Sequence, residues 1–326
     1  MHKDARSRGD QYRERLCYVL ATALCALPLT AFALTGRDAV AALTWGWKDL
    51  LTPITSELKH GQRVNYGVYD VHQRFSKAKG LAIEHIFLSW LSSDVNDQIS
   101  SAFSYAQERN RWLMITIEPS AVEGRASELL DDIVAEKYDS IIASICQSIG
   151  SLQAPMLIRW GHEMETGDFR YPWSGATGAN YIGAYRHFAA RCRTYAPRIY
   201  LVWSPKGAPG LADYYPGRAF VDVIGLSLYE LPSYDLDHHG KLLGFEELFG
   251  PKYNRVAGLD RSVMIAELGV SGEAKYQRYW MAGLFRTASK FPLLRTIVYF
   301  DRKDVPGAWP EKYGIPDWTI DANILE

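Results

Sequence analysis

The chain has 326 residues, of which 48% are apolar and 22% are charged, so it can bury a large core and is not a disordered protein. Lys and Arg number 36 against 37 Asp and Glu, a balance that gives no electrostatic basis for binding nucleic acid or an anionic membrane surface. The 10 Trp and 20 Tyr can supply both core packing and flat apolar faces for a ligand.

The N-terminus has the pattern of an export signal. Basic residues up to Arg15 precede an apolar run at 16–34, in which Ala31-Phe32-Ala33 offers small residues at the spacing of a signal-peptidase site. Pro28 interrupts the run and favours a removed signal. The alternative is a retained membrane anchor through 16–34, because the run is close to the length that spans a bilayer. We therefore expect a secreted or periplasmic protein, or one anchored in the inner membrane with its folded part outside the cytoplasm.

Three regions follow from this pattern. We expect the signal or anchor at 1–34, a helical lead-in at 35–62, and a single folded domain at 63–326. Cys146 and Cys192 remain after the signal, and both one disulfide and two separately buried thiols stay open as interpretations. No Cys or His pair has zinc-ligand spacing, and His238-His239 lies in a polar loop, so we expect no metal site.

Eight short apolar runs, each bounded by polar residues, follow one another along the domain. They span 65–70, 85–90, 112–118, 155–160, 199–205, 222–229, 263–267 and 296–301. Helix-period segments lie at 97–109, 131–149, 179–195 and 274–289. Nearly continuous apolar runs are typical of parallel strands buried on both faces. The pattern predicts an α/β fold, a (β/α)8 TIM barrel. A doubly wound open sheet is the alternative, although no G-x-G-x-x-G follows the first run to support a dinucleotide cofactor.

The carboxyl ends of the predicted strands carry mainly carboxylates and aromatic rings, and active sites of such barrels lie at these ends. The candidate residues are Asp70, Trp90, Glu118, His162, Glu163, Trp203, Tyr229, Glu267 and Asp301. No Ser or Cys stands in a nucleophile-elbow motif. The residues at these strand ends therefore favour a reaction catalysed by carboxylates. The aromatic rings among them suit a ligand with an apolar face, such as a sugar.

Glu163 and Glu267 end the fourth and seventh strands, which lie on opposite sides of the mouth of a closed eight-stranded barrel, so their side chains can converge. Glycoside hydrolysis needs two carboxylates, one to protonate the departing oxygen and one to attack the anomeric carbon or activate water. A separation of about 5–5.5 Å would give double displacement with retention of configuration. The acid role leads us to expect a raised pKa for Glu163.

Two further residues are placed to support these carboxylates. Strand alternation puts Arg159 on the same inward face as Glu163. There its guanidinium either holds the nucleophile anionic or forms an ion pair that only fills the barrel interior. Tyr229 ends the sixth strand beside the seventh, and either donates its hydroxyl to Glu267 or caps a layer of the barrel.

Three segments resemble glycoside hydrolase family 26. Arg159-Trp160-Gly161-His162-Glu163-Met164, followed by Tyr171-Pro172-Trp173, is similar to the R-x-x-H-E-M segment of that family. The run from Tyr214 to Tyr229 resembles its strand-six region, and Ile265-Ala266-Glu267-Leu268-Gly269 resembles its nucleophile segment. The resemblance covers most of 65–320, and the segments occur in the order of the family.

The resemblance implies a retaining, endo-acting β-glycanase with Glu163 as acid/base and Glu267 as nucleophile. It also implies that His162 contacts the nucleophile or the substrate, that Tyr229 hydrogen bonds to the nucleophile, and that Trp173 is a platform for a bound sugar. The chain departs from the family pattern at Glu165-Thr166, where mannanases usually have Asn-Gly, and at the end of the eighth strand, Tyr299-Phe300-Asp301, where a Trp is expected. These departures fall on the substrate floor, so they weigh against mannan and leave both carboxylates intact.

We therefore expect a monomeric endo-β-glycanase that acts on a β-linked polysaccharide, β-glucan or β-mannan, without a cofactor. Further supporting residues are expected at Trp90, Trp203, Asp70 and Asp301. Two alternatives stay open: a non-catalytic carbohydrate-binding or polysaccharide-export accessory protein on the same fold, and a transglycosylase that uses the same residues. The sequence leaves open which β-glycan and linkage are cut and how many sugars are bound.

Overall fold

The computed structural model describes residues 64–121, 128–167 and 170–325. The signal or anchor expected at 1–34 and the lead-in expected at 35–62 lie outside these residues. Within the described ranges, no helix combines the length and the apolar character needed to traverse a bilayer.

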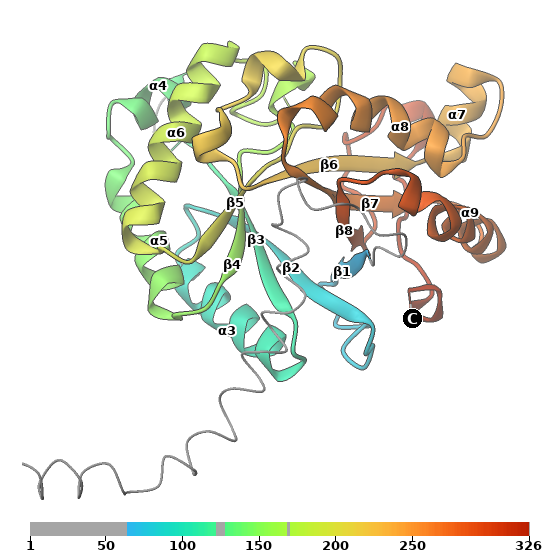
Figure 1. The fold of residues 1–326 in the computed structure, drawn as a ribbon, viewed down its shortest axis with the longest axis horizontal. Helices are drawn as coiled ribbons and strands as arrows, with labels where there is room; N and C mark the ends of the chain where they lie inside the picture. Colours follow the sequence, from blue (N-terminus) through green and yellow to red (C-terminus); the bar gives the residue numbers. More distant parts are fainter. Residues whose placement is uncertain (1–63, 122–127, 168–169, 326) are drawn as a thin grey trace, which may run out of the picture. The chain divides into compact units, whose positions relative to one another are not determined.

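Eight parallel strands close into a barrel in the order in which they occur along the chain (Figure 1). They are β1 (Asn65–Tyr69), β2 (Leu81–Ser89), β3 (Trp112–Glu118), β4 (Met156–Trp160), β5 (Ile199–Trp203), β6 (Val223–Glu230), β7 (Ser262–Val270) and β8 (Leu294–Phe300). Because β1 pairs with β8 as well as with β2, the sheet has no free edge. The predicted TIM barrel is confirmed, and the open doubly wound sheet is excluded.

Helices lie around the strands, as Figure 1 shows. They are α3 (Val95–Glu108), α4 (Leu129–Val134), α5 (Asp139–Ser151), α6 (Gly178–Tyr195), α7 (Pro232–His239), α8 (Phe245–Val256) and α9 (Ala274–Thr287). Short 3₁₀ turns occupy Met164–Thr166, Leu211–Tyr214, Arg218–Phe220, Ala257–Leu259, Ala288–Lys290, Glu311–Tyr313 and Ala322–Ile324.

The helices differ from the sequence expectation in two places. The segment predicted at 131–149 is broken between α4 and α5, where Glu136 adopts a left-handed backbone conformation with a φ of 65° that no helix can continue through. Helices α7 and α8 had no predicted counterpart, and α8 contains Pro251. A proline in the interior of a segment counts against a helix, because it cannot donate a backbone hydrogen bond and its ring crowds the preceding turn.

Strand alternation divides the core into two layers, and β4 shows the division. Trp160 points outward, with its ring 5.3 Å from that of Phe188 on α6. Arg159, the residue before it, points inward and is fully buried in the barrel. Apolar packing between strands and helices therefore holds the barrel closed, while the barrel interior is free to carry polar groups that reach toward its mouth.

A disulfide joins Cys146 of α5 to Cys192 of α6, with 5.1 Å between the two Cα atoms. It decides between the two interpretations that the sequence left open. The helices also approach closely one turn further on, where a Cβ at Gly150 would lie 2.1 Å from the carbonyl oxygen of Tyr195. Any larger residue at Gly150 would therefore force the two helices apart next to the disulfide.

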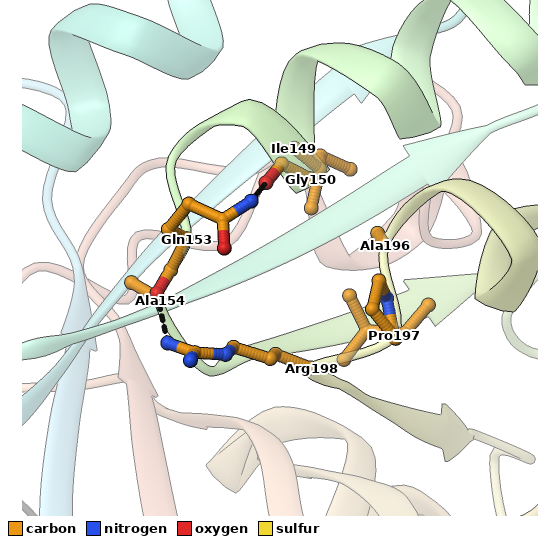
Figure 2. Close-up of a pocket in the computed structure, with 8 residues that line it drawn as sticks. Ile149, Gly150, Gln153, Ala154, Ala196, Pro197 and Arg198 are labelled. Atoms are coloured by element: carbon orange, nitrogen blue, oxygen red, sulfur yellow. Dashed lines mark hydrogen bonds between the residues drawn. The ribbon is translucent and has the colours of Figure 1, made fainter. Parts of the chain in front are cut away.

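A small hollow lies next to this pair of helices, at the amino-terminal ends of β4 and β5 (Figure 2). The Arg198 guanidinium donates a hydrogen bond to the Gln153 carbonyl there, and the Gln153 amide donates to the Gly150 carbonyl at 2.9 Å. No carboxylate is among the residues that line it. The hollow is thus at the opposite end of the strands from the candidate residues and lacks the groups that hydrolysis would need.

Candidate active site

The chain turns sharply after β4, and this turn fixes the Glu163 backbone. Both Gly161 and Glu163 have a φ of 53°, in the left-handed region that residues other than glycine rarely occupy. The Glu163 amide donates a hydrogen bond of 2.8 Å to the carbonyl of Ser204, just after β5, and the Tyr181 hydroxyl donates to the Gly161 carbonyl. An unfavourable conformation held by such contacts is a common feature of functional sites.

Arg159 reaches up through the barrel to Glu267. Its Nη2 lies 2.5 Å from Glu267 Oε1, its Nε donates to Ser204 Oγ at 2.8 Å, and its Nη1 donates to Thr116 Oγ1 at 3.3 Å. Arg159 is 0% exposed and Glu267 is 6% exposed. An ion pair so well screened from water fixes the orientation of the carboxylate.

A bulge in β7 aims Glu267. Leu226 of β6 is paired with Ile265, but the next residue, Ser227, is paired with Glu267, so the pairing skips one residue of β7. Bulges of this kind redirect a side chain at the rim of a barrel. The Tyr229 hydroxyl donates a short hydrogen bond to Glu267 Oε2, as the sequence anticipated. Burial, followed by the charge of Glu267, raises the pKa of Tyr229 well above its ordinary value, so the phenol stays protonated as a donor.

The Tyr229 ring is held in place by Gly269, its partner across the β6–β7 pair. A Cβ at Gly269 would lie 2.6 Å from Cδ1 of Tyr229 and 2.9 Å from the ring of Trp318. The absence of a side chain at Gly269 therefore lets the phenol lie flat against the strand and reach the Glu267 carboxylate.

Glu163 is 4% exposed, and cationic groups surround it. Burial alone would raise its pKa, but Lys206, the Ser227 hydroxyl, Arg170 and Arg159 outweigh burial and hold the pKa below its ordinary value. The raised pKa expected from the acid role is therefore wrong for the protein without substrate. The physical reason is the positive charge that gathers around Glu163, which no pattern in the sequence reveals.

The two carboxylates share their neighbours. Ser227 contributes to lowering the pKa of Glu163 and is the β6–β7 pairing partner of Glu267. After burial, both carboxylates contribute to raising the pKa of Tyr171 and of Tyr229. Glu163 and Glu267, which stand 104 residues apart in the sequence, therefore act on one set of side chains at the mouth of the barrel.

His162 is buried beside this pair. Burial, with the nearby charges of Arg159 and Arg170, lowers the pKa of His162 well below its ordinary value, so the imidazole is neutral. Its ring contacts Tyr171 at 4.7 Å and Phe87 at 5.8 Å between ring centroids. Its backbone carbonyl accepts a hydrogen bond of 2.6 Å from the Trp173 indole.

The expected sugar platform at Trp173 needs correction. Trp173 is 1% exposed, because Tyr171 stacks on it with a centroid distance of 4.7 Å and an interplanar angle of 5°. Tyr171 is partly exposed and lies within the electrostatic reach of both carboxylates. The ring available to a sugar at this position is thus Tyr171, and Trp173 supports it from behind.

Trp90 and Trp203 are also buried rather than available to a ligand. The Trp90 indole donates to the Ser120 carbonyl and stacks on Tyr138 at 5.0 Å. Trp203 is 0% exposed and packs edge-on against Tyr215. Both residues contribute to packing around the barrel and not to its mouth.

Asp70 and Asp301 are used to hold the chain together. Asp70 accepts a hydrogen bond of 2.6 Å from the Phe75 amide, which closes the turn after β1. Both Asp301 oxygens lie 2.8 Å from the Arg74 guanidinium, and Asp301 also accepts from the Ile320 amide. The Arg74–Asp301 pair ties the β1–β2 connection to the C-terminal segment, so Asp70 and Asp301, which were expected as supporting residues, hold the backbone in place.

Phe87, Lys206 and Arg170 were missed by sequence reasoning. Phe87 is a partly exposed ring 6.0 Å from Phe300, which the sequence analysis had placed on the substrate floor and which also lies 6.0 Å from Tyr229. Lys206 and Arg170 supply the positive charge near Glu163. The alternation along β2 could have found Phe87, because it lies two residues beyond the inward-facing His85. Arg170 and Lys206 lie in loops, where no periodic pattern indicates direction.

Across 64–121, 128–167 and 170–325, no three His, Cys, Asp or Glu side chains are grouped so that they could hold a metal ion. His238 stacks on the ring of Tyr234 at 3.9 Å, which accounts for one of the two adjacent histidines.

Solved structures share the fold of this chain. A β-mannanase of family 26 from Bacteroides ovatus matches with a TM-score of 0.58 and 14% identity, over 80% of this chain and 85% of that one. A family 26 protein from Muricauda sp. matches with a TM-score of 0.61 and 14% identity, over 86% and 94% of the two chains. Identities this low show a common fold and nothing finer.

Sequence comparisons give the family. A curated relative named β-1,3-xylanase, from Alcaligenes sp., is 27% identical over 107 residues, which is 31% of this chain and 22% of that protein. The model of glycosyl hydrolase family 26 matches residues 103–270, a span that contains both Glu163 and Glu267. The resemblance inferred from the three sequence segments is confirmed, and the chain belongs to glycosyl hydrolase family 26.

Proposed function

We propose that the protein is a retaining endo-β-glycanase in which Glu267 is the nucleophile and Glu163 the acid/base. The observation that carries the proposal is the environment of Glu267. Arg159 and Tyr229 each hold one of its two carboxylate oxygens, and the bulge in β7 brings it opposite Ser227 in the pairing with β6. A carboxylate whose two oxygens are held in this way is suited to attack the anomeric carbon of a sugar.

The reaction has two steps. In the first, Glu267 attacks the anomeric carbon, the bond to the leaving oxygen breaks, and Glu163 gives its proton to that oxygen. In the second, Glu163 takes a proton from water, which attacks the same carbon and releases the Glu267 carboxylate. The neutral His162 imidazole beside Glu163 provides a hydrogen-bonding group without adding charge to the site.

The low pKa of Glu163 in the free protein sets a condition on this mechanism. The first step needs Glu163 protonated, while Lys206, Arg170 and Arg159 favour its charged form. We therefore propose an acidic pH optimum for kcat/KM, since that quantity reports the protonation states of the free enzyme.

The substrate that we propose is a β-linked polysaccharide, β-glucan or β-mannan. The partly exposed rings of Phe87, Tyr171 and Phe300 give apolar faces on which sugar rings can stack. The names of the relatives, a β-1,3-xylanase and a β-mannanase, place β-1,3-xylan and mannan beside β-glucan as the polymers to compare.

We also propose that the folded part lies outside the cytoplasm. The buried disulfide between Cys146 and Cys192 supports this location, because such bonds persist in oxidising compartments. The basic and apolar pattern of 1–34 agrees with it. Sequencing the N-terminus of the protein recovered from its native host distinguishes the two cases. After cleavage of the signal the mature protein starts near residue 34, whereas a retained anchor leaves the N-terminus intact.

The activity is tested by measuring reducing ends released from mixed-linkage glucan, curdlan, glucomannan, galactomannan and β-1,3-xylan, with products sized by chromatography. We expect oligosaccharides from at least one polymer, and a loss of about 10³-fold or more for both Glu163→Gln and Glu267→Gln. Retention of full activity by either variant would contradict the assignment. Polysaccharide binding without release, by the folded parent protein, would favour the non-catalytic alternative.

A further inference from the structure

Two cationic side chains of helix α8 contact the connection that follows β5. The Lys252 ammonium donates hydrogen bonds of 2.7 Å to the carbonyl of Lys206 and of 2.7 Å to the carbonyl of Ser227. Arg255, one turn later, donates to the carbonyl of Gly207 at 3.0 Å. Helix α8 therefore ties the connection that follows β5 to Ser227 within β6.

The same connection is held from the other side by Glu165. Its Oε1 accepts hydrogen bonds from the amides of Gly207 and Ala208, at 2.8 and 3.1 Å. In the segment from Lys206 to Ala208, the carbonyls of Lys206 and Gly207 thus accept hydrogen bonds from Lys252 and Arg255, and the amides of Gly207 and Ala208 donate to Glu165. Such complete hydrogen bonding fixes a loop that would otherwise be mobile.

Gly207 makes this arrangement sterically feasible. It has a φ of 92°, and a Cβ there would lie 2.9 Å from Cγ and 3.0 Å from Cβ of Lys252. The stem of Lys252 passes over the bare glycine backbone to reach the two carbonyls. This close packing of the Lys252 stem against Gly207 fixes the position of the ammonium.

The connection whose backbone Lys252 binds is also hydrogen bonded to the turn that carries Glu163. The Glu163 amide donates to the carbonyl of Ser204, and Glu165, two residues later, accepts from the amides of Gly207 and Ala208. We propose that Lys252 is a positioning residue for Glu163: by holding the carbonyls of Lys206 and Ser227, it fixes the connection after β5 to which the Glu163 turn is bonded. The charge of Lys206, which lowers the pKa of Glu163, lies on the same connection. The inference rests on the proposed function, because it treats Glu163 as the acid/base.

The charges around Lys252 agree with this role. Burial lowers the pKa of Lys252 to about 8, against the opposing influence of Glu163. The other charged groups that act on it are Lys206, Glu165 and Arg255. The ammonium therefore begins to lose its proton just above neutral pH, and its hydrogen bonds to the two carbonyls weaken over the same range.

Titration of the Glu163 carboxyl by ¹³C NMR tests the inference, with the signal assigned by its loss in Glu163→Gln. In Lys252→Met we expect the pKa of Glu163 to rise by about one unit, since a positive charge is removed and the connection that carries Lys206 loses its anchor. In the parent protein we expect a second inflection of the Glu163 signal near pH 8, when Lys252 titrates. This second measurement needs no substitution at Lys252, so it stands even if the variant fails to fold.

Lys290→Met is the matched control, because Lys290 also contacts α8 but pairs with the exposed Glu246. It should leave the titration of Glu163 unchanged. An unchanged pKa in folded Lys252→Met, or a Glu163 signal without an inflection near pH 8, would overturn the inference. Both measurements are made without substrate. They are therefore independent of the hydrolysis assay, in which full activity of Glu163→Gln would instead overturn the proposed function.

Kinetics give a further readout that a purely structural role would not move. We expect Lys252→Met to lower kcat about tenfold, to leave KM within about twofold, and to shift the basic limb of kcat/KM to higher pH. Ser227→Ala removes the hydroxyl but leaves its carbonyl with Lys252, and should produce the same direction of shift. A loss of stability with an unmoved pH profile would show that Lys252 only supports the fold.

Discussion

Arg159 and Glu267 form an ion pair of 2.5 Å inside the barrel, with the arginine inaccessible to solvent. The remaining donors of Arg159 go to Ser204 and Thr116 on the neighbouring strands. Residues on β3 and β4 and directly after β5 thereby position the Glu267 carboxylate. This relationship explains why the R-x-x-H-E-M segment needs an arginine four residues before the glutamate: the arginine lies inside the barrel while Glu163 lies at its rim.

Replacement of this arginine is expected to be costly. Arg159→Met leaves the buried Glu267 without its cation, which should lower stability by about 3 to 5 kcal/mol. It should also lower kcat/KM at least about 100-fold, because the nucleophile loses its orientation. Thermal unfolding and steady-state kinetics measure the two effects. Arg278→Met is the control, since it breaks an exposed ion pair with Asp321 and should cost less than about 1 kcal/mol.

The hydrogen bond from Tyr229 to Glu267 is tested from two sides. Tyr229→Phe removes the donor, and a hydrogen bond to a charged group is worth about 1.5–3 kcal/mol, which corresponds to roughly a 10- to 100-fold loss in kcat. Gly269→Ala keeps the hydroxyl but places a Cβ where the ring lies, and should lower kcat by displacing it. Full activity in Gly269→Ala would show that the position of the ring is unimportant.

The charge of Lys206 is expected to appear in the pH profile. Lys206 lowers the pKa of Glu163, so Lys206→Met should raise that pKa. The protonated acid then persists to higher pH, and the basic limb of kcat/KM moves toward neutrality. A basic limb that moves to lower pH, or stays in place, would mean that Lys206 does not act on the acid. Lys275→Met, on α9, provides a control of equal charge change.

Glu230 at the end of β6 makes stability depend on pH. Burial raises its pKa to about 8, although the Tyr276 hydroxyl donates to it at 2.5 Å. Because the folded-state pKa is the higher one, the folded state binds the proton more tightly than the unfolded state does. This contribution to stability is full below the ordinary pKa and is lost as pH rises through 8.

Glu230→Gln stays neutral, so its melting temperature should fall less than that of the parent between pH 6 and pH 9. Glu246→Gln, an exposed carboxylate paired with Lys290, should follow the parent curve. Identical curves for the parent protein and Glu230→Gln would be inconsistent with a buried, protonated carboxyl.

The sequence predicted the barrel and the two central glutamates because both depend on local patterns. Buried parallel strands read as apolar runs, and polar residues near the carboxyl ends of such strands lie toward the mouth. The predicted partners of Glu267 also depend on alternation, which is why Arg159 and Tyr229 were found. Each of these inferences needs the direction of a side chain along one strand and nothing more.

Contacts between distant segments could not be predicted in this way. Asp301 directly follows β8, yet its partner Arg74 stands 227 residues earlier, and no pattern in either segment indicates the pair. Trp90, Trp173 and Trp203 were chosen for their chemistry and their place after strands, but packing buries all three. The low pKa of Glu163 arises from charges on several separate segments, so it too became visible only in the folded chain.

The roles of the two glutamates are tested most directly by azide rescue, with an activated aryl β-glycoside of the preferred sugar. In Glu163→Ala, azide should attack the glycosyl ester on Glu267 and give a β-glycosyl azide, whereas in Glu267→Ala it should attack the substrate directly and give the α-anomer. Proton NMR of the isolated azides distinguishes the two. The account predicts β from Glu163→Ala and α from Glu267→Ala; the reverse assignment, or the same anomer from both variants, would contradict it.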